Sequence, residues 1–220
     1  MAKFKKGILG GFQGHIANVV GSSWKGKDVM KIRPAVVANP NTESQQRQRA
    51  RFGMVGRLVQ AHRNVIRVGF RAYTKEMTSS NAAMSYNLAN AIAGEFPNLS
   101  IDYSNIKLSM GTLPVIAGIS VTSISAATVS LSWTGINLIK NARSSDQLLV
   151  SLTHPLTGEV EYFPSCASRD ETNVELVLPE HWSGRTVEVY LFLVSVDGNT
   201  LTNSPESVSN TVYVGTVEIN

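Results

Sequence analysis

The chain has 220 residues, of which 43% are hydrophobic, and its formal net charge is +4. This length is enough for one large domain or two small ones that each bury a core. The single cysteine, Cys166, excludes an internal disulfide framework and a cysteine-based metal cluster, and no stretch approaches the roughly 18 consecutive apolar residues of a membrane-spanning helix.

The charge is distributed unevenly along the sequence. Residues 1–75 contain fifteen of the twenty Lys and Arg residues but only two acidic ones, Asp28 and Glu43, so this part is about +13. The remaining 145 residues contain five basic and fourteen acidic residues and are about −9. Such a separation indicates that the partner is nucleic acid, an anionic surface or the acidic part of another copy.

The first 14 residues are rich in glycine and contain Lys3, Lys5 and Lys6, which predicts a flexible basic arm. The apolar run that follows these lysines ends at Gln13 and is not followed by an A-x-A-like cleavage site. We therefore expect a protein that is made in the cytoplasm without a Sec signal.

Glycines and β-branched residues dominate the segment from residue 7 to residue 37. Turn signals at 21–23 and 26–28 divide this segment into short runs, which predicts a small β-meander. Trp24, between the two turns, is its largest apolar side chain.

A long amphipathic helix is predicted from residue 44 to residue 75. Asn39 and Pro40 fit an N-cap and a first helical residue, and Thr42-x-x-Gln45 fits a capping box. At 100° per residue the apolar side chains gather on one face: Phe52, Val55, Leu58, Val59, His62, Val65, Ile66, Phe70 and Tyr73. The basic side chains gather on another: Arg49, Arg57, Arg63, Arg67, Arg71 and Lys75.

Beyond this helix the pattern predicts a second helix and a hairpin. Ser79 or Ser80 can cap a helix over 81–95, which Pro97 ends. Residues 99–103 and 106–110 alternate with period two and predict a β-hairpin. We expect a domain boundary at 111–114, so that an α+β domain over 15–112 precedes a second domain over 115–220.

The second domain is predicted to be an all-β sandwich. Seven short alternating strands are expected, at 117–122, 127–134, 147–154, 158–163, 173–178, 186–195 and 208–217. Trp133, Tyr190 and Phe192 would supply an aromatic core. This half resembles a fibronectin type III or other immunoglobulin-like module without its disulfide.

No residue pattern indicates catalysis, and we expect no catalytic, cofactor-binding or metal-binding residues. His62 lies on the apolar helix face, which favours a packing histidine over a metal ligand. His154 and His181 fall in predicted turns and are expected to be exposed. Glu159 and Glu161 alternate on a predicted strand and are interpreted as a solvated face.

Arg63, Arg67 and Arg71 form a stripe at i, i+4 and i+8 and are the main candidate for binding. Arginine forks can bind phosphates, whose contacts would be sensitive to salt. The stripe can equally be a solvated face or pair with acidic side chains of a neighbouring copy. These two interpretations are favoured over nucleic acid, because no aromatic side chains are interleaved with the arginines.

A short N-terminal pattern provides a further resemblance. Gly14 to Gly26 reads GHIANVVGSSWKG and is followed by Asn39-Pro40-Asn41-Thr42-x-x-Gln45. This signature resembles that of a domain-of-unknown-function family of Bacteroidota, and a related pattern occurs in phage or prophage virion-like proteins. The resemblance transfers no catalytic residue and implies a structural part of a phage-like particle or of another ordered assembly.

These observations favour a non-enzymatic structural protein that self-assembles into, or decorates, a phage-like particle or filament. Its expected partners are further copies and other structural proteins of the assembly, and its expected location is the virion or assembled particle. The alternatives are a DNA-binding protein that uses the basic face of helix 44–75, and a surface- or carbohydrate-binding adhesin module. The expected contact residues are Lys3, Lys5, Lys6, Trp24, Lys25, Arg33, Arg49, Arg63, Arg67 and Arg71.

Overall fold

The computed structural model describes residues 3–4, 11–24, 26–36, 38–74, 77–197, 200–201 and 204–220. The chain divides into two compact units, Met1–Glu43 and Ser44–Asn220. The predicted fold class is confirmed: a β-meander and three helices precede a sandwich of β-sheets.

The first unit contains one antiparallel sheet in the order β1-β2-β3-β4. Its strands are β1 (Lys3–Phe4), β2 (Phe12–Ile16), β3 (Val19–Trp24) and β4 (Lys27–Ile32). The tight turns between them need left-handed backbone, which Ala17 adopts at φ 48° and Gly26 at φ 80°. Residues 3–4 and 12–14 of the expected flexible arm are therefore paired within this sheet.

The predicted single helix over 44–75 is wrong, because this part of the chain is broken into three helical segments. It consists of α1 (Glu43–Ala61), α2 (Arg63–Gly69) and the short 3-10 helix η1 (Arg71–Tyr73). The first break is at His62, whose φ of −91° and ψ of 20° depart from helical values. The expected cap at 39–40 also lies before the helix, which begins at Glu43.

The second predicted helix is α3 (Ser79–Asn90), which begins and ends earlier than expected. Thr78 rather than a serine caps it, because the Thr78 hydroxyl accepts a hydrogen bond from the Asn81 N–H at 3.1 Å. After the helix, β5 (Ile92–Ala93) pairs with β6 (Ser100–Ile101).

The predicted hairpin over 99–110 is also wrong. Asp102 accepts hydrogen bonds from residues 104 and 105, and this turns the chain into the 3-10 helix η2 (Tyr103–Asn105). The segment around Lys107 forms hydrogen bonds with α3 instead of with a strand. The buried Asn87 side chain donates to the Lys107 carbonyl and accepts from the Lys107 N–H, both at 2.9 Å.

The C-terminal half is a fibronectin type III-like sandwich, as expected. One sheet has the order β11-β8-β7 and the other the order β10-β9-β12-β15, with all pairs antiparallel. The strands are β7 (Ser120–Ser125), β8 (Thr128–Ser132), β9 (Gln147–Thr153), β10 (Val160–Ser168), β11 (Asn173–Val177), β12 (Thr186–Val194) and β15 (Val212–Glu218). The connection between β12 and β15 contains the short pair β13 (Val196–Asp197) and β14 (Thr200–Leu201), and the 3-10 helices η3 (Glu180–Trp182) and η4 (Pro205–Ser207) lie in turns.

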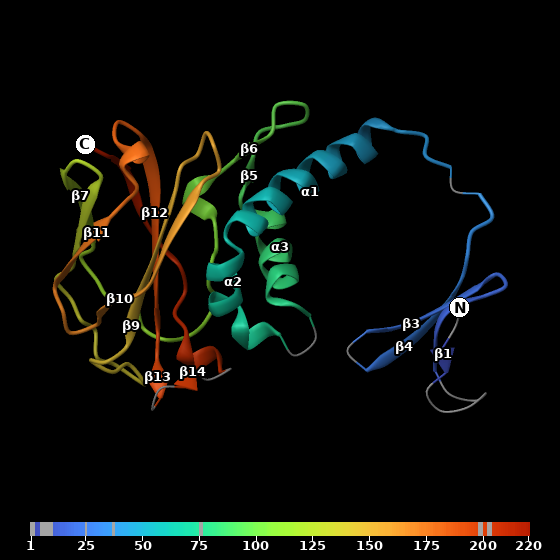
Figure 1. The fold of residues 1–220 in the computed structure, drawn as a ribbon, viewed down its shortest axis with the longest axis horizontal. Coiled ribbons are helices and arrows are strands. Elements are labelled where there is room, and N and C mark those ends of the chain that lie inside the picture. The colour runs from blue at the N-terminus through green and yellow to red at the C-terminus, as the bar shows by residue number, and fades with distance from the viewer. Residues whose placement is uncertain are drawn as a thin grey trace. The chain divides into compact units, whose positions relative to one another are not determined.

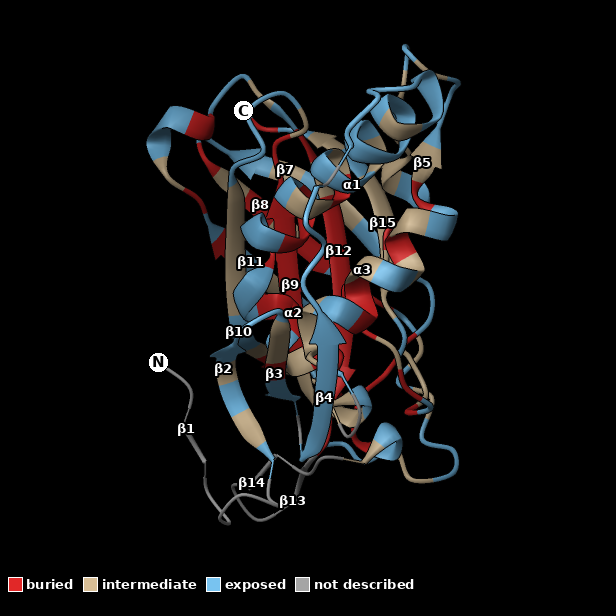
Figure 2. Cartoon of the chain, turned by 90° about the vertical axis from the view of Figure 1, so that its right-hand side faces the viewer, coloured by how far each residue is buried: buried red, intermediate tan, exposed pale blue. Residues whose placement is uncertain are grey.

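Two apolar cores lie on opposite faces of the four-stranded sheet. Trp133 and Trp182 pack in the core between the two sheets. Tyr190 and Phe192, which were expected in that same core, face the other way and pack with the helices. Figure 1 shows α1, α2 and α3 on that side of the sheet, and Figure 2 shows β9 and β12 buried.

This second core explains why residues 44–220 form one compact unit, although the sequence indicated a boundary at 111–114. Val55, Val59 and Ile66 of the helices share the core with Leu149 of β9. The segment at the expected boundary is itself packed. A Cβ at Gly111 would clash with the carbonyl oxygen of Val208.

Candidate functional site

One face of the N-terminal sheet is mostly apolar. In register, Ile16 lies opposite Val19, which in turn lies opposite Ile32, and Gly21 lies opposite Met30. Residues directly opposite one another share a face, and so do residues two apart on one strand. We call the following set the apolar face: Phe12, Ile16, Val19, Met30 and Ile32.

The apolar face is largely uncovered. Ile32 is 77% exposed, Met30 68% and Ile16 41%. Among the described residues of this unit only Gly21 is buried, and the Phe12 ring lies against it. A sheet with an apolar face normally buries that face against another layer, so this one indicates an interaction surface.

The opposite face of the same sheet is mixed in character. Trp24 is 56% exposed and lies directly opposite Lys27, and Val29 is 51% exposed. Lys31 lies opposite Val20 on this face. The sheet therefore has one face of mostly apolar and small side chains, to which β4 adds the Asp28 carboxylate, and another on which lysines alternate with apolar groups.

The predicted contact residues of the first unit lie partly outside the described part of the chain. This is true of Lys5, Lys6 and Lys25, while the backbone of Lys3 pairs with Gln13. Arg33 is exposed, and its backbone N–H donates to the Asn18 carbonyl at 2.7 Å. Trp24 therefore lies at the end of β3 in the exposed sheet, and Arg33 directly follows β4.

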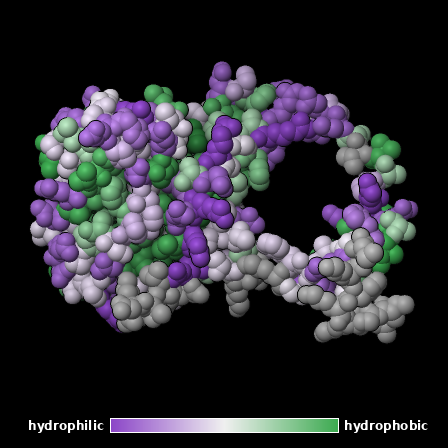
Figure 3. All heavy atoms as spheres, in the orientation of Figure 1, coloured by the Kyte–Doolittle hydropathy of each residue, from purple (hydrophilic) through white to green (hydrophobic). Residues whose placement is uncertain are grey.

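The predicted arginine stripe is only partly preserved. Arg63 and Arg67 are exposed one turn apart on α2, but Arg71 lies beyond the end of α2, in η1, and is half-buried. Arg49 lies on the first half of α1, where Figure 3 shows strongly hydrophilic side chains. That half is exposed on nearly all sides, and Phe52, expected on the buried face, is 53% exposed.

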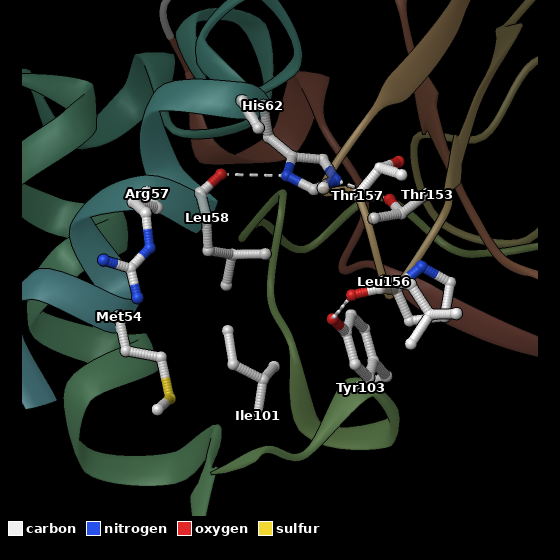
Figure 4. Close-up of a pocket in the computed structure, with 12 residues that line it drawn as sticks. Met54, Arg57, Leu58, His62, Ile101, Tyr103, Thr153, Leu156 and Thr157 are labelled. Atoms are coloured by element: carbon white, nitrogen blue, oxygen red, sulfur yellow. Dashed lines mark hydrogen bonds between the residues drawn. The ribbon is translucent and has the colours of Figure 1, made fainter. Parts of the chain in front are cut away.

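A pocket of about 340 Å³ lies between α1 and the turn that joins β9 to β10 (Figure 4). Met54, Leu58 and Ile101 form apolar walls, and Leu156 lies at the rim. Arg57, exposed on α1, contributes the only charged side chain among the described residues that line it.

His62 lines this pocket and is fully buried. Its Nδ1–H donates to the Leu58 carbonyl at 2.9 Å, and its Nε2 accepts from the Thr153 hydroxyl at 2.8 Å. Burial lowers the His62 pKa from 6.5 to about 4, and the hydrogen bond to Leu58 opposes this only in part. Both ring nitrogens are thus occupied, which confirms a packing role and leaves neither nitrogen free to exchange a proton with a bound molecule.

The remaining histidines and the single cysteine differ in their burial. His181 is exposed as expected, but the expectation for His154 is wrong, since that residue is 7% exposed and its Nδ1 accepts a hydrogen bond from the Thr157 N–H. Burial raises the pKa of the Cys166 thiol to about 12, which disfavours the nucleophilic thiolate at neutral pH. Over the described ranges, no three His, Cys, Asp or Glu side chains converge as a metal site would require.

The apolar face was not predicted from the sequence. Its signal is the alternation in β4, where Met30 and Ile32 fall on one side, but only the strand register shows that Ile16 and Val19 join them. In the part of the chain that the structure describes, no helix has the length and apolar character needed to cross a membrane.

Comparison with known proteins gives a family and a fold. A family described as "Family of unknown function (DUF6266)" matches residues 11–215, and no curated protein matches the chain. The fn3 domain of human collagen alpha-1(XX) chain is similar at 11% identity, over 49% of this chain and 85% of that one, with a TM-score of 0.35. A structure titled "Myokine structure" is similar at 10% identity, over 49% and 98%, with the same TM-score.

Proposed function

Because this chain belongs to the DUF6266 family, whose function is unknown, we propose a role from its own geometry. The protein is a non-enzymatic structural subunit that self-associates through its N-terminal sheet. The assembly that it builds or decorates is a phage-like particle or filament. Its partners are further copies and other structural proteins of that assembly.

The uncovered apolar face is the observation on which this proposal rests. Met30 and Ile32 are more than two-thirds exposed, although burying one such side chain is favourable by about 1.5–3 kcal/mol. A small four-stranded sheet that lacks a core gains this stabilisation only by adding a second layer. A subunit of an ordered assembly would bury the face whenever neighbouring copies are in place.

The phage-like context is supported by the sequence signature. Residues 14–26 and the Asn39-Pro40-Asn41-Thr42 segment resemble N-terminal patterns of virion-like proteins. The signature covers the end of β2, all of β3 and the segment that leads to α1, so it includes part of the sheet proposed to bind neighbours. We therefore place the protein in an assembled particle.

The test is the mass of the full chain in solution as its concentration rises. Wild-type protein should form species larger than a monomer by sedimentation velocity and light scattering. Met30→Asp should shift the distribution to monomer, because it replaces an apolar side chain at the centre of β4 by a second carboxylate next to Asp28, which is costly to bury. Val29→Asp is the matched control, since Val29 is 51% exposed on the other face of the same strand.

Two results would contradict the proposal. One is a wild-type chain that stays monomeric at high concentration. The other is an equal effect of Met30→Asp and Val29→Asp, which would show that the apolar face has no special part in association. Far-ultraviolet circular dichroism of each variant checks that the fold is retained.

One observation favours DNA binding as a second candidate. Arg63 and Arg67 are exposed one turn apart, and between described residues no ion pair includes either of them. Binding to a short duplex should then fall steeply between about 50 and 200 mM salt and be lost in Arg63→Ala/Arg67→Ala. Arg143→Ala, an exposed arginine of the sandwich, is the control. Absence of salt-dependent binding would reject this candidate.

A further inference from the structure

The pocket between α1 and the β9–β10 turn has the dimensions of a small-molecule site. Its volume of about 340 Å³ falls in the range of about 300–1,000 Å³ that is usual for such sites. Figure 4 shows Met54 and Arg57 of α1 on one side of it, and Tyr103 and Leu156 on the other. All of its lining residues belong to the unit Ser44–Asn220, so the pocket does not depend on the N-terminal sheet.

Apolar side chains form the walls and the rim of this pocket. Met54, Leu58 and Ile101 line it, and Leu156 at the rim is 91% exposed. An exposed apolar side chain beside an open apolar hollow is typical of a ligand-binding groove. A bound molecule with an apolar body would cover Leu156 together with these walls.

The neutral polar side chains of the pocket already donate their protons within the protein. The Thr153 hydroxyl donates to His62 Nε2 at 2.8 Å, and the Tyr103 hydroxyl donates to the Pro155 carbonyl at 3.0 Å. The Thr157 hydroxyl donates in the same way to the histidine of its own turn, whose Nδ1 also accepts from the Thr157 N–H. Among the described residues of the lining, none of these side chains keeps a free O–H for a ligand.

Arg57 is the side chain of the pocket that can bind an anion. It is exposed on α1, and between residues that the structure describes no ion pair includes its guanidinium. Two carboxylates are close to the lining segments in sequence, but both are held elsewhere. Asp102 accepts hydrogen bonds within its own turn, and Glu159 pairs with Arg185 at 3.0 Å. Neither of them lines the pocket, so the guanidinium charge is available to a ligand.

We propose that this pocket binds a small monocarboxylate with an aromatic or branched aliphatic body. The apolar body packs against Met54, Ile101 and Leu156, and the carboxylate accepts hydrogen bonds from the Arg57 guanidinium. The planar guanidinium suits a carboxylate because it donates two parallel N–H bonds to the two oxygens. The satisfied hydroxyls explain why the anionic group, rather than a neutral acceptor, provides the polar recognition.

Equilibrium dialysis of the full chain against 1-naphthylacetate tests the proposal, and the neutral 1-naphthylacetamide is the matched probe. The two probes share their apolar body, and naphthalene fluorescence measures the concentration of each. Wild-type protein should bind the carboxylate with a Kd on the order of 0.1–1 mM, as is usual for a ligand of this size. It should bind the amide about tenfold or more weakly, because the amide carries no charge for Arg57.

Two variants with matched controls locate the binding. Arg57→Gln should weaken binding of the carboxylate by about tenfold and leave the amide unchanged, whereas Arg63→Gln, outside the lining, should change neither. Ala61→Phe should weaken both probes, because a ring at this lining position takes up pocket volume. Gln60→Phe, at the neighbouring exposed position outside the lining, should bind like wild type. Circular dichroism of each variant checks that the fold is retained.

Three results would overturn the proposal. The first is equal binding of the two probes by wild-type protein, which would show that the charge is not recognised. The second is an equal effect of Arg57→Gln and Arg63→Gln, which would indicate general attraction of anions to the basic helices. The third is no binding of either probe at about 5 mM, well above the expected Kd. None of these measurements depends on whether the protein self-associates, so this proposal and the proposed function succeed or fail separately.

Discussion

His62 predicts a loss of stability in mild acid. Its imidazole is fully buried between α1 and β9 and is neutral, with a pKa lowered from 6.5 to about 4. Between these two values the unfolded chain binds a proton that the folded chain does not, so the free energy of unfolding falls as the pH falls. The contribution is fully present above pH 6.5 and is lost as the pH decreases toward 4.

The size of the effect follows from the shift. A change of 2.5 pKa units corresponds to about 3 kcal/mol at full protonation, and about 2 kcal/mol of it is lost between pH 7 and pH 5. Urea unfolding followed by tryptophan fluorescence measures this, because Trp133 and Trp182 are buried in the sandwich core.

His62→Gln is the variant that isolates the contribution. Glutamine retains a donor and an acceptor but does not titrate, so the variant should lose less stability than wild type over the same pH range by about 2 kcal/mol. Other titrating groups affect both proteins alike and cancel in the comparison. Equal pH dependence of the two proteins would refute the assignment of a neutral, buried imidazole.

Three further predictions concern buried groups. Arg169→Met should lower the free energy of unfolding in urea by about 3–5 kcal/mol, because it removes the ion-pair partner of the buried Asp146. Arg185→Met, which breaks a partly exposed pair with Glu159, should lower it by less than about 1 kcal/mol. Gly69→Ala should lower the melting temperature, since its Cβ would clash with a carbonyl oxygen at a cost of about 1–3 kcal/mol, whereas Gly53→Ala on open α1 should raise it slightly. Iodoacetamide should alkylate Cys166 at pH 8 about 100-fold more slowly in the folded chain than in urea, and similar rates would contradict its raised pKa.

The strands could be predicted because their signal is local. In β8, Val129 and Leu131 are buried and alternate with Ser130 and Ser132, so the sequence alone indicates both the strand and its inner face. The predicted end of β10 at 163 was too early, since the strand continues past Pro164 and a bulge to Ser168.

The interruptions of the helices could not be predicted, because they depend on distant partners. His62 is held by Thr153, which is 91 residues away. Lys107 is held by Asn87, so a segment with strand-like alternation pairs with a helix. Leu149 lies in a run of consecutive buried residues in β9, which is the pattern of a strand covered on both faces, yet the sequence does not show what covers it.

Only part of the candidate site could be predicted from the sequence. The N-terminal segment was expected to form contacts because of its charge, and Trp24 and Arg33 are indeed exposed there. The apolar face required the register of three strands, and its exposure is a property of the folded unit rather than of the residues. No alternation pattern distinguishes Met30 at 68% exposure from a methionine that packs in a core.

The double-sided burial of β9 and β12 has a consequence for synthesis on the ribosome. The helices leave the exit tunnel first, but Leu149 and Phe192, against which they pack, are translated about 80 to 140 residues later. During that interval Val55 and Ile66 have no sheet to pack against, and the nascent chain exposes apolar surface. Both cores therefore need β12, and they are complete only when Val208 and Ile219 have followed it.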